Sequence, residues 1–355
     1  MPGAVLVAGR GGPEPLLRHV AGDAQRDAVA RRPMTADTVF DLASLTKVVA
    51  TLPALLHLAR RGGIGLDEPV CRYLPAFAGP GKDQVTARQL LLHTSGLPGS
   101  RRYYRRLRDP AEIRAAALAE PLVARPGTVF CYSGVGFITL GELAAAVAGC
   151  GLDELVRDVV CAPLGLTATR YLPPVSWAAR IAATELVRGQ AKVGVVHDEN
   201  AEALGGVAGH AGLFGTAADL ARYASAWVGD GASGASGASG VSGVSGAPGW
   251  VGDGPAARAL RAEALRGQTG GLGGGGRRGL GWGLRGDLWD NMGHGWPALG
   301  AGHTGFTGTS LSVDPVTGLW AVLLTNAVHF GRGPEHSVVG LRQQVHAAVA
   351  GALLA

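Results

Sequence analysis

Ser44 and Lys47 are the residues of this sequence whose types and spacing are best suited to chemistry. They stand three positions apart in Ser44-Leu45-Thr46-Lys47, and lysine occurs at only two other positions of the chain. Residues i and i+3 share one face of a helix, so the two side chains can touch. A serine hydroxyl becomes a nucleophile when a base takes its proton, and a lysine can be that base. The tetrad therefore predicts acyl transfer through Ser44; the alternative is a capping serine beside a solvated lysine.

Two further motifs follow Ser44-x-x-Lys47 along the chain. Tyr132-Ser133-Gly134 lies in the middle of the sequence, and His303-Thr304-Gly305 precedes a late strand-like segment. This order of SxxK, Tyr-Ser-x and [K/H]-T-G resembles the serine β-lactamase and penicillin-binding-protein superfamily, most of all its branch of class C β-lactamases, esterases and DD-peptidases. The flanking segments that strengthen the resemblance are 40–47, 86–98, 126–137, 196–224 and 303–315.

The resemblance implies a role for each motif residue. Ser44 would be the nucleophile, Lys47 its base or proton partner, and Tyr132 a second acid/base that passes a proton to the leaving group. His303 stands where many members carry lysine, and it would help to hold the proton of Tyr132 and to orient an anionic group. Its reference pKa of about 6.5 would leave it largely neutral at pH 7. The backbone amides of Ser44 and Phe306 would form the oxyanion hole.

A second set of residues is expected to contact substrate. Its members are Gly134, Thr304, Gly305, His197, Asp198 and Asn200. Members of the superfamily usually carry Asn or Asp where this chain has Gly134, a side chain that contacts the substrate and steadies the catalytic lysine. The glycine therefore predicts poor turnover of β-lactams.

The segment 196–201 reads VHDENA. It is similar to a subgroup that includes an amidase cleaving muramic acid from the stem peptide, and it suggests that His197, Asp198 and Asn200 line the cleft. The alternative is a turn whose polar side chains satisfy the backbone.

Hydrophobic periodicity predicts the elements that must position these motifs. Strands are expected at 4–9, 309–313 and 319–326, the last two joined through the turn 314–318. A long helix should begin near Asp41 and end near Arg61, before Gly62-Gly63. Further helices are expected at 86–93, 110–120, 136–149, 152–159, 217–228 and 338–354.

The fold class expected is α+β, with the β-lactamase/transpeptidase-like arrangement that the resemblance implies. An antiparallel sheet flanked by helices would be built from both chain ends, 1–60 and 277–355, with a mostly helical domain inserted at 61–230. Residues 231–276, which begin with a Gly/Ala/Ser repeat, are expected to be a flexible insert. A GxGxxG pattern at Gly271, Gly273 and Gly276 follows no strand, so a dinucleotide site is not expected.

Composition limits the remaining classes of function. Of the 355 residues, 47% are hydrophobic and 17% are charged, which excludes wholesale disorder. No apolar run reaches the ~18 residues of a membrane span, and no secretory signal is visible, so we expect a cytoplasmic protein. The basic run 101–108 is interpreted as a solvated loop near the cleft mouth, and no nucleic-acid partner is expected. Trp282, Trp289 and Trp296 could wall a pocket or pack the core.

No set of metal ligands accompanies the motifs. His197, Asp198 and His210 lack the spacing of a zinc site, so neither a metal nor another cofactor is expected. We therefore expect a serine hydrolase that cleaves an ester or amide of a small-molecule or peptide-like substrate through an acyl-enzyme on Ser44. Three alternatives remain open at this stage: an acyltransferase of the same fold, a muropeptide amidase or DD-peptidase-like enzyme, and a degenerate binding protein. The sequence carries no signal for the oligomeric state.

Overall fold

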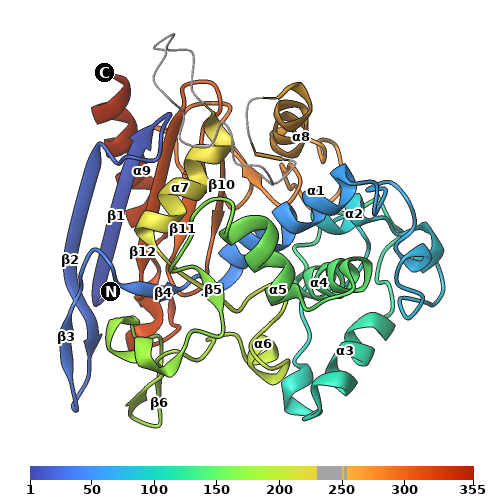
Figure 1. The fold of residues 1–355 in the computed structure, drawn as a ribbon, viewed down its shortest axis with the longest axis horizontal. Coiled ribbons are helices and arrows are strands. Elements are labelled where there is room, and N and C mark those ends of the chain that lie inside the picture. Colours follow the sequence, from blue (N-terminus) through green and yellow to red (C-terminus); the bar gives the residue numbers. More distant parts are fainter. Residues whose placement is uncertain (230–249, 252–253) are drawn as a thin grey trace.

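The computed structural model describes residues 1–229, 250–251 and 254–355. Its largest sheet is antiparallel and seven-stranded, in the order β3-β2-β1-β12-β11-β10-β9. The strands are β1 (Gly3–Arg10), β2 (Leu17–Arg26), β3 (Arg31–Pro33), β9 (Gly283–Leu284), β10 (Ala301–Thr304), β11 (Ser310–Val313) and β12 (Leu319–Thr325). The first strand pairs with the last, from Ala4 opposite Thr325 to Arg10 opposite Leu319. The expected α+β fold, with an antiparallel sheet built from both chain ends, is thus confirmed (Figure 1).

The central strands are apolar because helices cover both faces of the sheet. On β1, Val5 and Val7 join the large core beneath α7 (Ala217–Val228), whereas Ala8 joins a smaller cluster with Val349 of α9 (Val339–Leu354). Side chains of a strand alternate between faces, so one buried strand serves two layers. Figure 1 shows the sheet between α7 and α9.

A block of helices lies beside the sheet (Figure 1). It contains α1 (Leu52–Arg60), α2 (Ala87–Leu91), α3 (Pro110–Ala119), α4 (Gly134–Ala148), α5 (Leu152–Val156) and α6 (Glu199–Ala203). Local sequence sets their ends: Thr86 and Gln89 form a capping box on α2, and Gly149 ends α4 in a left-handed conformation at φ 71°.

A smaller three-stranded sheet joins the helical block to the segment that carries Ser44. It consists of β4 (Val39–Asp41), β8 (Leu213–Thr216) and β5 (Arg170–Tyr171), in the order β4-β8-β5. The amide of Leu42 continues the pairing by donating to the carbonyl of Leu213 at 2.9 Å. This sheet was not expected from the sequence, and it fixes the chain directly before Ser44. The remaining two strands, β6 (Leu186–Val187) and β7 (Gln190–Ala191), form a short hairpin.

The helix expected over 41–61 is divided into three pieces. A 3-10 turn at Ala43–Leu45 leads into a π-helical turn at Lys47–Thr51, and α1 follows. Pro53 has no N–H to donate, and the amide of Leu52 bonds instead to the carbonyl of Lys47. The hydroxyl of Tyr223 satisfies the carbonyl of Val48.

Much of the Gly/Ser-rich insert expected at 231–276 lies outside the described residues. Its described part includes helix α8 (Pro255–Leu265), whose Ala264 and Leu265 are buried. Arg88 of α2 bonds to Glu263 at 2.6 Å, so this part packs on the helical block. Over the described chain, no single helix is long and apolar enough to cross a membrane; α4 passes only jointly with 152–161, across a bend of 80°.

Candidate active site

Ser44 stands in the 3-10 turn that follows β4. The preceding residue, Ala43, has φ +48°, a left-handed conformation that a residue with a Cβ rarely adopts. Thr46 supports the turn because its hydroxyl donates to the carbonyl of Ala43 at 2.6 Å and accepts from the amide of Leu213 at 3.2 Å. The hydroxyl of Ser44 reaches a cavity, whereas its neighbours Ala43 and Leu45 are buried.

Lys47 lies beside Ser44, as the spacing predicts. Its Nζ is 3.0 Å from the Ser44 Oγ and donates to the carbonyl of His210 at 2.9 Å. The side chain is 1% exposed. The hydroxyl of Thr51 donates to the carbonyl of Gly209 at 2.7 Å, which ties the 209–210 segment to the same helix. Two partners on different segments therefore fix the Lys47 Nζ beside the Ser44 hydroxyl.

Tyr132 lies over Lys47, with the Nζ 5.2 Å from its ring centroid. The ring of His93 packs against Tyr132 at 4.5 Å between centroids, and its Nδ1 accepts from the amide of Ser133 at 2.9 Å. Burial, and then the charges of Arg278 and Lys47, hold the pKa of His93 well below its ordinary value. The neutral imidazole therefore positions Tyr132, a role that the sequence did not suggest.

His303 lies on β10 and reaches the site from that strand. Its ring lies 6.1 Å from that of Tyr132 between centroids, and its Nδ1 bonds to the carbonyl of Thr304 at 2.9 Å. Because a carbonyl only accepts, Nδ1 carries the hydrogen and Nε2 is an acceptor. Burial, and then the charges of Lys47 and Arg278, hold the pKa of His303 well below its ordinary value. His303 is thus neutral, and its Nε2 is buried without a partner in the described chain.

The loop after β10 packs directly on the nucleophile turn. The hydroxyl of Thr307 donates to the carbonyl of Asp41 at 2.9 Å, and that of Thr309 donates to the carbonyl of Leu42 at 3.1 Å. A Cβ at Gly305 would lie 2.1 Å from the Thr309 Oγ1 and 2.5 Å from the Leu42 oxygen. Only glycine allows this approach, which places Phe306 at the same cavity as Ser44.

A cavity of about 620 Å³ opens beside Ser44. Six residues proposed from the sequence line or face it through their side chain or backbone: Ser44, Tyr132, His303, Thr304, Gly305 and Phe306. Trp289, 51% exposed, lies at the wall and meets Tyr132 edge-on at 5.4 Å. Trp282 and Trp296 are buried in the core. The tryptophans therefore divide between the two roles considered for them.

A family profile described as Beta-lactamase matches residues 1–342. The chain belongs to the β-lactamase family. One relative comes from Escherichia coli K12 and is provisionally named a D-alanyl-D-alanine carboxypeptidase. It is 31% identical to this chain, and the match covers 83% of this chain and 70% of the relative.

Solved structures agree on the fold. A class C β-lactamase from Rhodobacter sphaeroides superposes with a TM-score of 0.72 at 19% identity, covering 100% of this chain and 95% of its own. EstCE1, a hydrolase with promiscuous acyltransferase activity, superposes with a TM-score of 0.67 at 23% identity. The match covers 97% of this chain and 93% of EstCE1. The protein is accordingly a serine hydrolase of the β-lactamase family, as the resemblance implied.

The other residues proposed for substrate binding lie outside the cavity lining. Gly134 begins α4, and its amide donates to the carbonyl of Gly99 at 2.7 Å. A Cβ at Gly134 would have room, with the Gly99 oxygen at 3.6 Å and the His210 Cδ2 at 3.9 Å. Asn200 donates to the carbonyl of Arg101 at 2.6 Å, which ties the basic run to α6.

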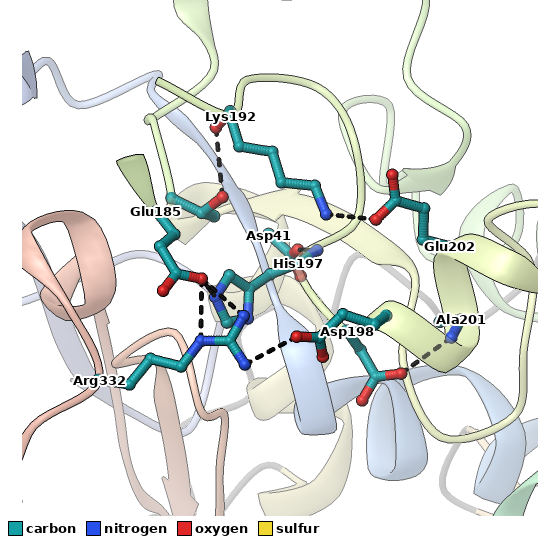
Figure 2. Close-up of polar contacts among 10 residues, drawn as sticks. Asp41, Glu185, Lys192, His197, Asp198, Ala201, Glu202 and Arg332 are labelled. Carbon is teal, nitrogen blue, oxygen red and sulfur yellow. Dashed lines mark hydrogen bonds and ion pairs between the residues drawn. The ribbon is translucent and has the colours of Figure 1, made fainter. Parts of the chain in front are cut away.

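His197 and Asp198 are held by protein partners. His197 Nε2 forms a hydrogen bond with the Glu185 carboxylate at 3.1 Å (Figure 2). The Asp198 carboxylate forms a hydrogen bond with His210 Nε2 at 2.9 Å. Burial opposes the charge on Asp198, but His210, the amide of Ala201 and the charge of Lys47 hold its pKa below the ordinary value. These contacts match the polar-turn alternative considered for the 196–201 segment. In the described part of the chain no group of three or more His, Cys, Asp and Glu could hold a metal.

Sequence reasoning missed three arginines that line the cavity in the described chain: Arg278, Arg332 and Arg342. Arg278 is buried against the rings of Tyr132 and Trp289, and its guanidinium pairs with Asp287 at 2.9 Å. Arg342 of α9 donates to the carbonyls of Gly305 and Thr309 at 2.9 Å. One signal could have revealed Arg342: it shares the buried face of α9 with His346, Val349 and Ala350, where an arginine is costly unless it has a task.

The cationic side chains at the cavity differ in whether a carboxylate pairs with them. Asp287 pairs with Arg278, and Asp290 pairs with Arg285 at 2.9 Å. Arg342 has only carbonyl and amide oxygens as partners within the described residues, and burial lowers its pKa to about 10, so it stays charged at neutral pH. Together with neutral His303, this leaves an unpaired positive charge at Arg342 on the cavity wall.

Proposed function

We propose that this serine hydrolase acts as a carboxypeptidase on peptides that end in a free carboxylate, of the acyl-D-alanyl-D-alanine class. The observation that carries the proposal is the charge of Arg342, which lines the same cavity as Ser44 and lacks a carboxylate partner among the described residues. An anionic chain end would balance that charge. The name of the relative at 31% identity supports the same substrate class.

The proposed reaction proceeds in two steps. Lys47, after its ammonium has given up a proton, takes the proton of the Ser44 hydroxyl as the Oγ attacks the carbonyl carbon, and the amides of Ser44 and Phe306 receive the oxyanion. Tyr132 donates a proton to the leaving nitrogen as the C–N bond breaks, and Lys47 returns its proton to Tyr132. Water then attacks the acyl-enzyme by the reverse proton path, which releases the acid and restores Ser44.

His303 and Arg342 determine the substrate preference in this proposal. A neutral His303 cannot bind a carboxylate through charge, because its unpartnered nitrogen Nε2 is an acceptor. It can accept a hydrogen bond from the Tyr132 hydroxyl or from a substrate N–H. The task of balancing an anionic end thus falls to Arg342, and that division distinguishes this site from relatives that carry lysine at the position of His303.

The experiment compares diacetyl-lysyl-D-alanyl-D-alanine with its C-terminal amide. We expect D-alanine release from the free acid with a kcat/KM at least about tenfold above that for the amide, as one charge-assisted hydrogen bond provides. Arg342→Met should remove this preference by raising KM for the acid, while Arg342→Lys should keep part of it. Equal cleavage of acid and amide by the wild-type protein would refute the proposal.

A second candidate is an esterase or acyltransferase, which the open space above Gly134 favours. A Cβ would have only ordinary contacts there, so the glycine leaves room that an Asn or Asp side chain would fill. Activated esters also depend less on the placement of Lys47 and Tyr132, because their leaving groups need less protonation. Partition of an acyl-enzyme between water and an added alcohol separates the two activities.

A further inference from the structure

Asp41, the last residue of β4, contacts three segments of the active site from a buried position. Its Oδ1 accepts from the amide of Ala43 at 2.8 Å, and its Oδ2 accepts from the amide of His197 at 2.6 Å. Its main-chain carbonyl accepts from the hydroxyl of Thr307 at 2.9 Å. Asp41 is 2% exposed and does not line the cavity, so within the described chain it acts on the site through these contacts.

Each of these contacts lies next to an expected donor of the oxyanion hole. Ala43 directly precedes Ser44, and Thr307 directly follows Phe306. His197 stacks its ring on that of Phe306, at 5.8 Å and 22° between planes. One residue thus holds the chain beside both amides, although Ser44 and Phe306 are 262 positions apart in the sequence.

We propose that Asp41 is a positioning residue that fixes the amides of Ser44 and Phe306 relative to one another. This inference rests on the proposed acyl-enzyme chemistry of Ser44. Oxyanion donors contribute only when they lie roughly 2.7–3.1 Å from the position that the oxyanion will occupy. Small displacements of either amide therefore lower the reaction rate. A single rigid group bonded to both sides is a direct way to maintain that distance.

The strained backbone of Ala43 makes such a restraint necessary. A non-glycine residue at positive φ costs about 1–3 kcal/mol and persists only when its surroundings enforce it. The hydrogen bond from the Ala43 amide to Asp41 Oδ1 joins residues two positions apart. Such a local bond stabilises a turn in place of the ordinary helical conformation. Without that acceptor, Ala43 would be free to relax and would carry the Ser44 amide with it.

A network of charges supports the Phe306 side (Figure 2). Glu185 accepts from His197 at 3.1 Å and from Arg332 at 2.6 Å, and Arg332 also pairs with Glu199 at 2.9 Å. The Arg332 guanidinium lies 6.0 Å from the Phe306 ring centroid. His197 therefore has its backbone held by Asp41 and its ring held by Glu185, so that the stack on Phe306 is fixed at both ends.

The variant Asp41→Asn tests the role because it keeps the shape of the side chain and replaces one acceptor by a donor. We expect kcat for a nitrophenyl ester to fall by about 10- to 100-fold, below the loss for deleting a whole oxyanion donor, with KM changed less than about threefold. A purely structural defect could lower kcat as well. The deciding measurement is therefore an oxygen-to-sulfur rate ratio. It divides the rate for an ester by the rate for the same ester with sulfur in place of the carbonyl oxygen.

Sulfur forms longer bonds and accepts hydrogen bonds poorly, so a well-placed oxyanion hole discriminates against it. We expect the oxygen-to-sulfur rate ratio to fall at least about fivefold in Asp41→Asn. Thr307→Val should lower the ratio from the other side of the site, and Thr307→Ser, which keeps the hydroxyl, should restore it. If Asp41→Asn does not fold, the Thr307 pair alone decides.

Asp219→Asn is the matched control. Asp219 is also a buried carboxylate that accepts from an amide, of Ala168 at 2.8 Å, and from a hydroxyl, of Thr169 at 2.9 Å, but it does not line the cavity. It should lower stability and leave the ratio unchanged. An unchanged ratio in folded Asp41→Asn or in Thr307→Val would overturn the role of Asp41. A wild-type protein that turns over neither ester would instead refute the acyl-enzyme proposal.

Discussion

Lys47 and His210 are joined by a bond from the lysine ammonium to the histidine main-chain carbonyl, at 2.9 Å. The resemblance to the superfamily implies that an Asn or Asp side chain at the position of Gly134 would steady this lysine. Here the ring of His210 lies beside Gly134, and the carbonyl of His210 holds the ammonium. The 209–210 segment thus supplies a restraint that the Tyr132-Ser133-Gly134 motif lacks.

Gly134→Asn should add a second restraint on Lys47. The new Cβ has room, and the side chain can hydrogen-bond to the lysine or to a substrate amide. One such bond is worth ~0.5–1.5 kcal/mol, so kcat/KM for nitrocefin should rise about three- to tenfold relative to a nitrophenyl ester. An unchanged ratio, or rapid nitrocefin hydrolysis by the wild-type protein, would show that Gly134 does not determine specificity.

Asp198→Asn should loosen the segment that holds Lys47. The Asp198 carboxylate bonds to the His210 ring at 2.9 Å and caps α6 through the amide of Ala201 at 2.8 Å. We expect kcat to fall about three- to tenfold, the equivalent of one hydrogen bond, with KM little changed. In the Gly134→Asn background the loss should be smaller, because the new side chain also restrains the lysine. Strictly additive effects in this double-mutant cycle would contradict the shared role.

The same carboxylate gives a pH dependence of stability. The pKa of Asp198 is lower in the folded protein than in the unfolded chain, mainly because His210 and Ala201 offset its burial. Its contribution to the free energy of unfolding is therefore present above about pH 4 and is lost as pH falls further. Urea unfolding at pH 7 and pH 3 should show a smaller difference for Asp198→Asn than for the wild-type protein.

His303 should remain neutral well below pH 6.5. Burial and the charges of Lys47 and Arg278 lower its folded-state pKa, so its stabilising contribution is complete above about pH 6.5 and is lost as pH falls below that value. Nitrogen NMR of labelled histidines, assigned with His303→Asn, should show the tautomer with hydrogen on Nδ1 at pH 6. A protonated ring at that pH would mean that His303 can bind an anion through charge.

Gly305→Ala should damage both folding and catalysis. The added methyl would lie 2.1 Å from the Thr309 hydroxyl and 2.5 Å from the Leu42 carbonyl, so the loop that carries Phe306 must move away from Ser44. Such overpacking costs typically ~1–3 kcal/mol. Gly340→Ala on α9, where a Cβ meets nothing within 4 Å, is the control and should stabilise by roughly 0.5–1 kcal/mol. Equal thermal stability of the two variants would argue against the close approach at Gly305.

Sequence reasoning succeeded where the signal is local. Helices α2, α3, α4, α7 and α9 and strands β1, β11 and β12 lie within a few residues of the expected ranges, because caps and periodicity are properties of neighbouring residues. The spacing of Ser44 and Lys47 likewise brought their side chains together, although the turn between them is not a regular α-helix.

The remaining features depend on pairings between distant segments. Asp41 meets His197 and Thr307 only because the segment before α6 and the loop after β10 both fold onto the end of β4. Likewise, α8 joins the helical block through Arg88. Strands β5 and β8 are short and pair residues such as Arg170 and Phe214, so neither has a pattern of its own. Arg342, which lines the cavity, comes from α9, a helix that the sequence predicts but to which it assigns no function.

Covalent labelling of Ser44 tests the central claim most directly. The protein should be treated with a fluorophosphonate, digested and mapped by mass spectrometry, beside the variant Ser44→Ala. We predict one adduct, on the peptide that contains Ser44, and loss of both the adduct and ester turnover in Ser44→Ala. An adduct on another serine, or full activity in Ser44→Ala, would contradict the acyl-enzyme on Ser44 and with it the roles derived for Lys47, Tyr132 and Asp41.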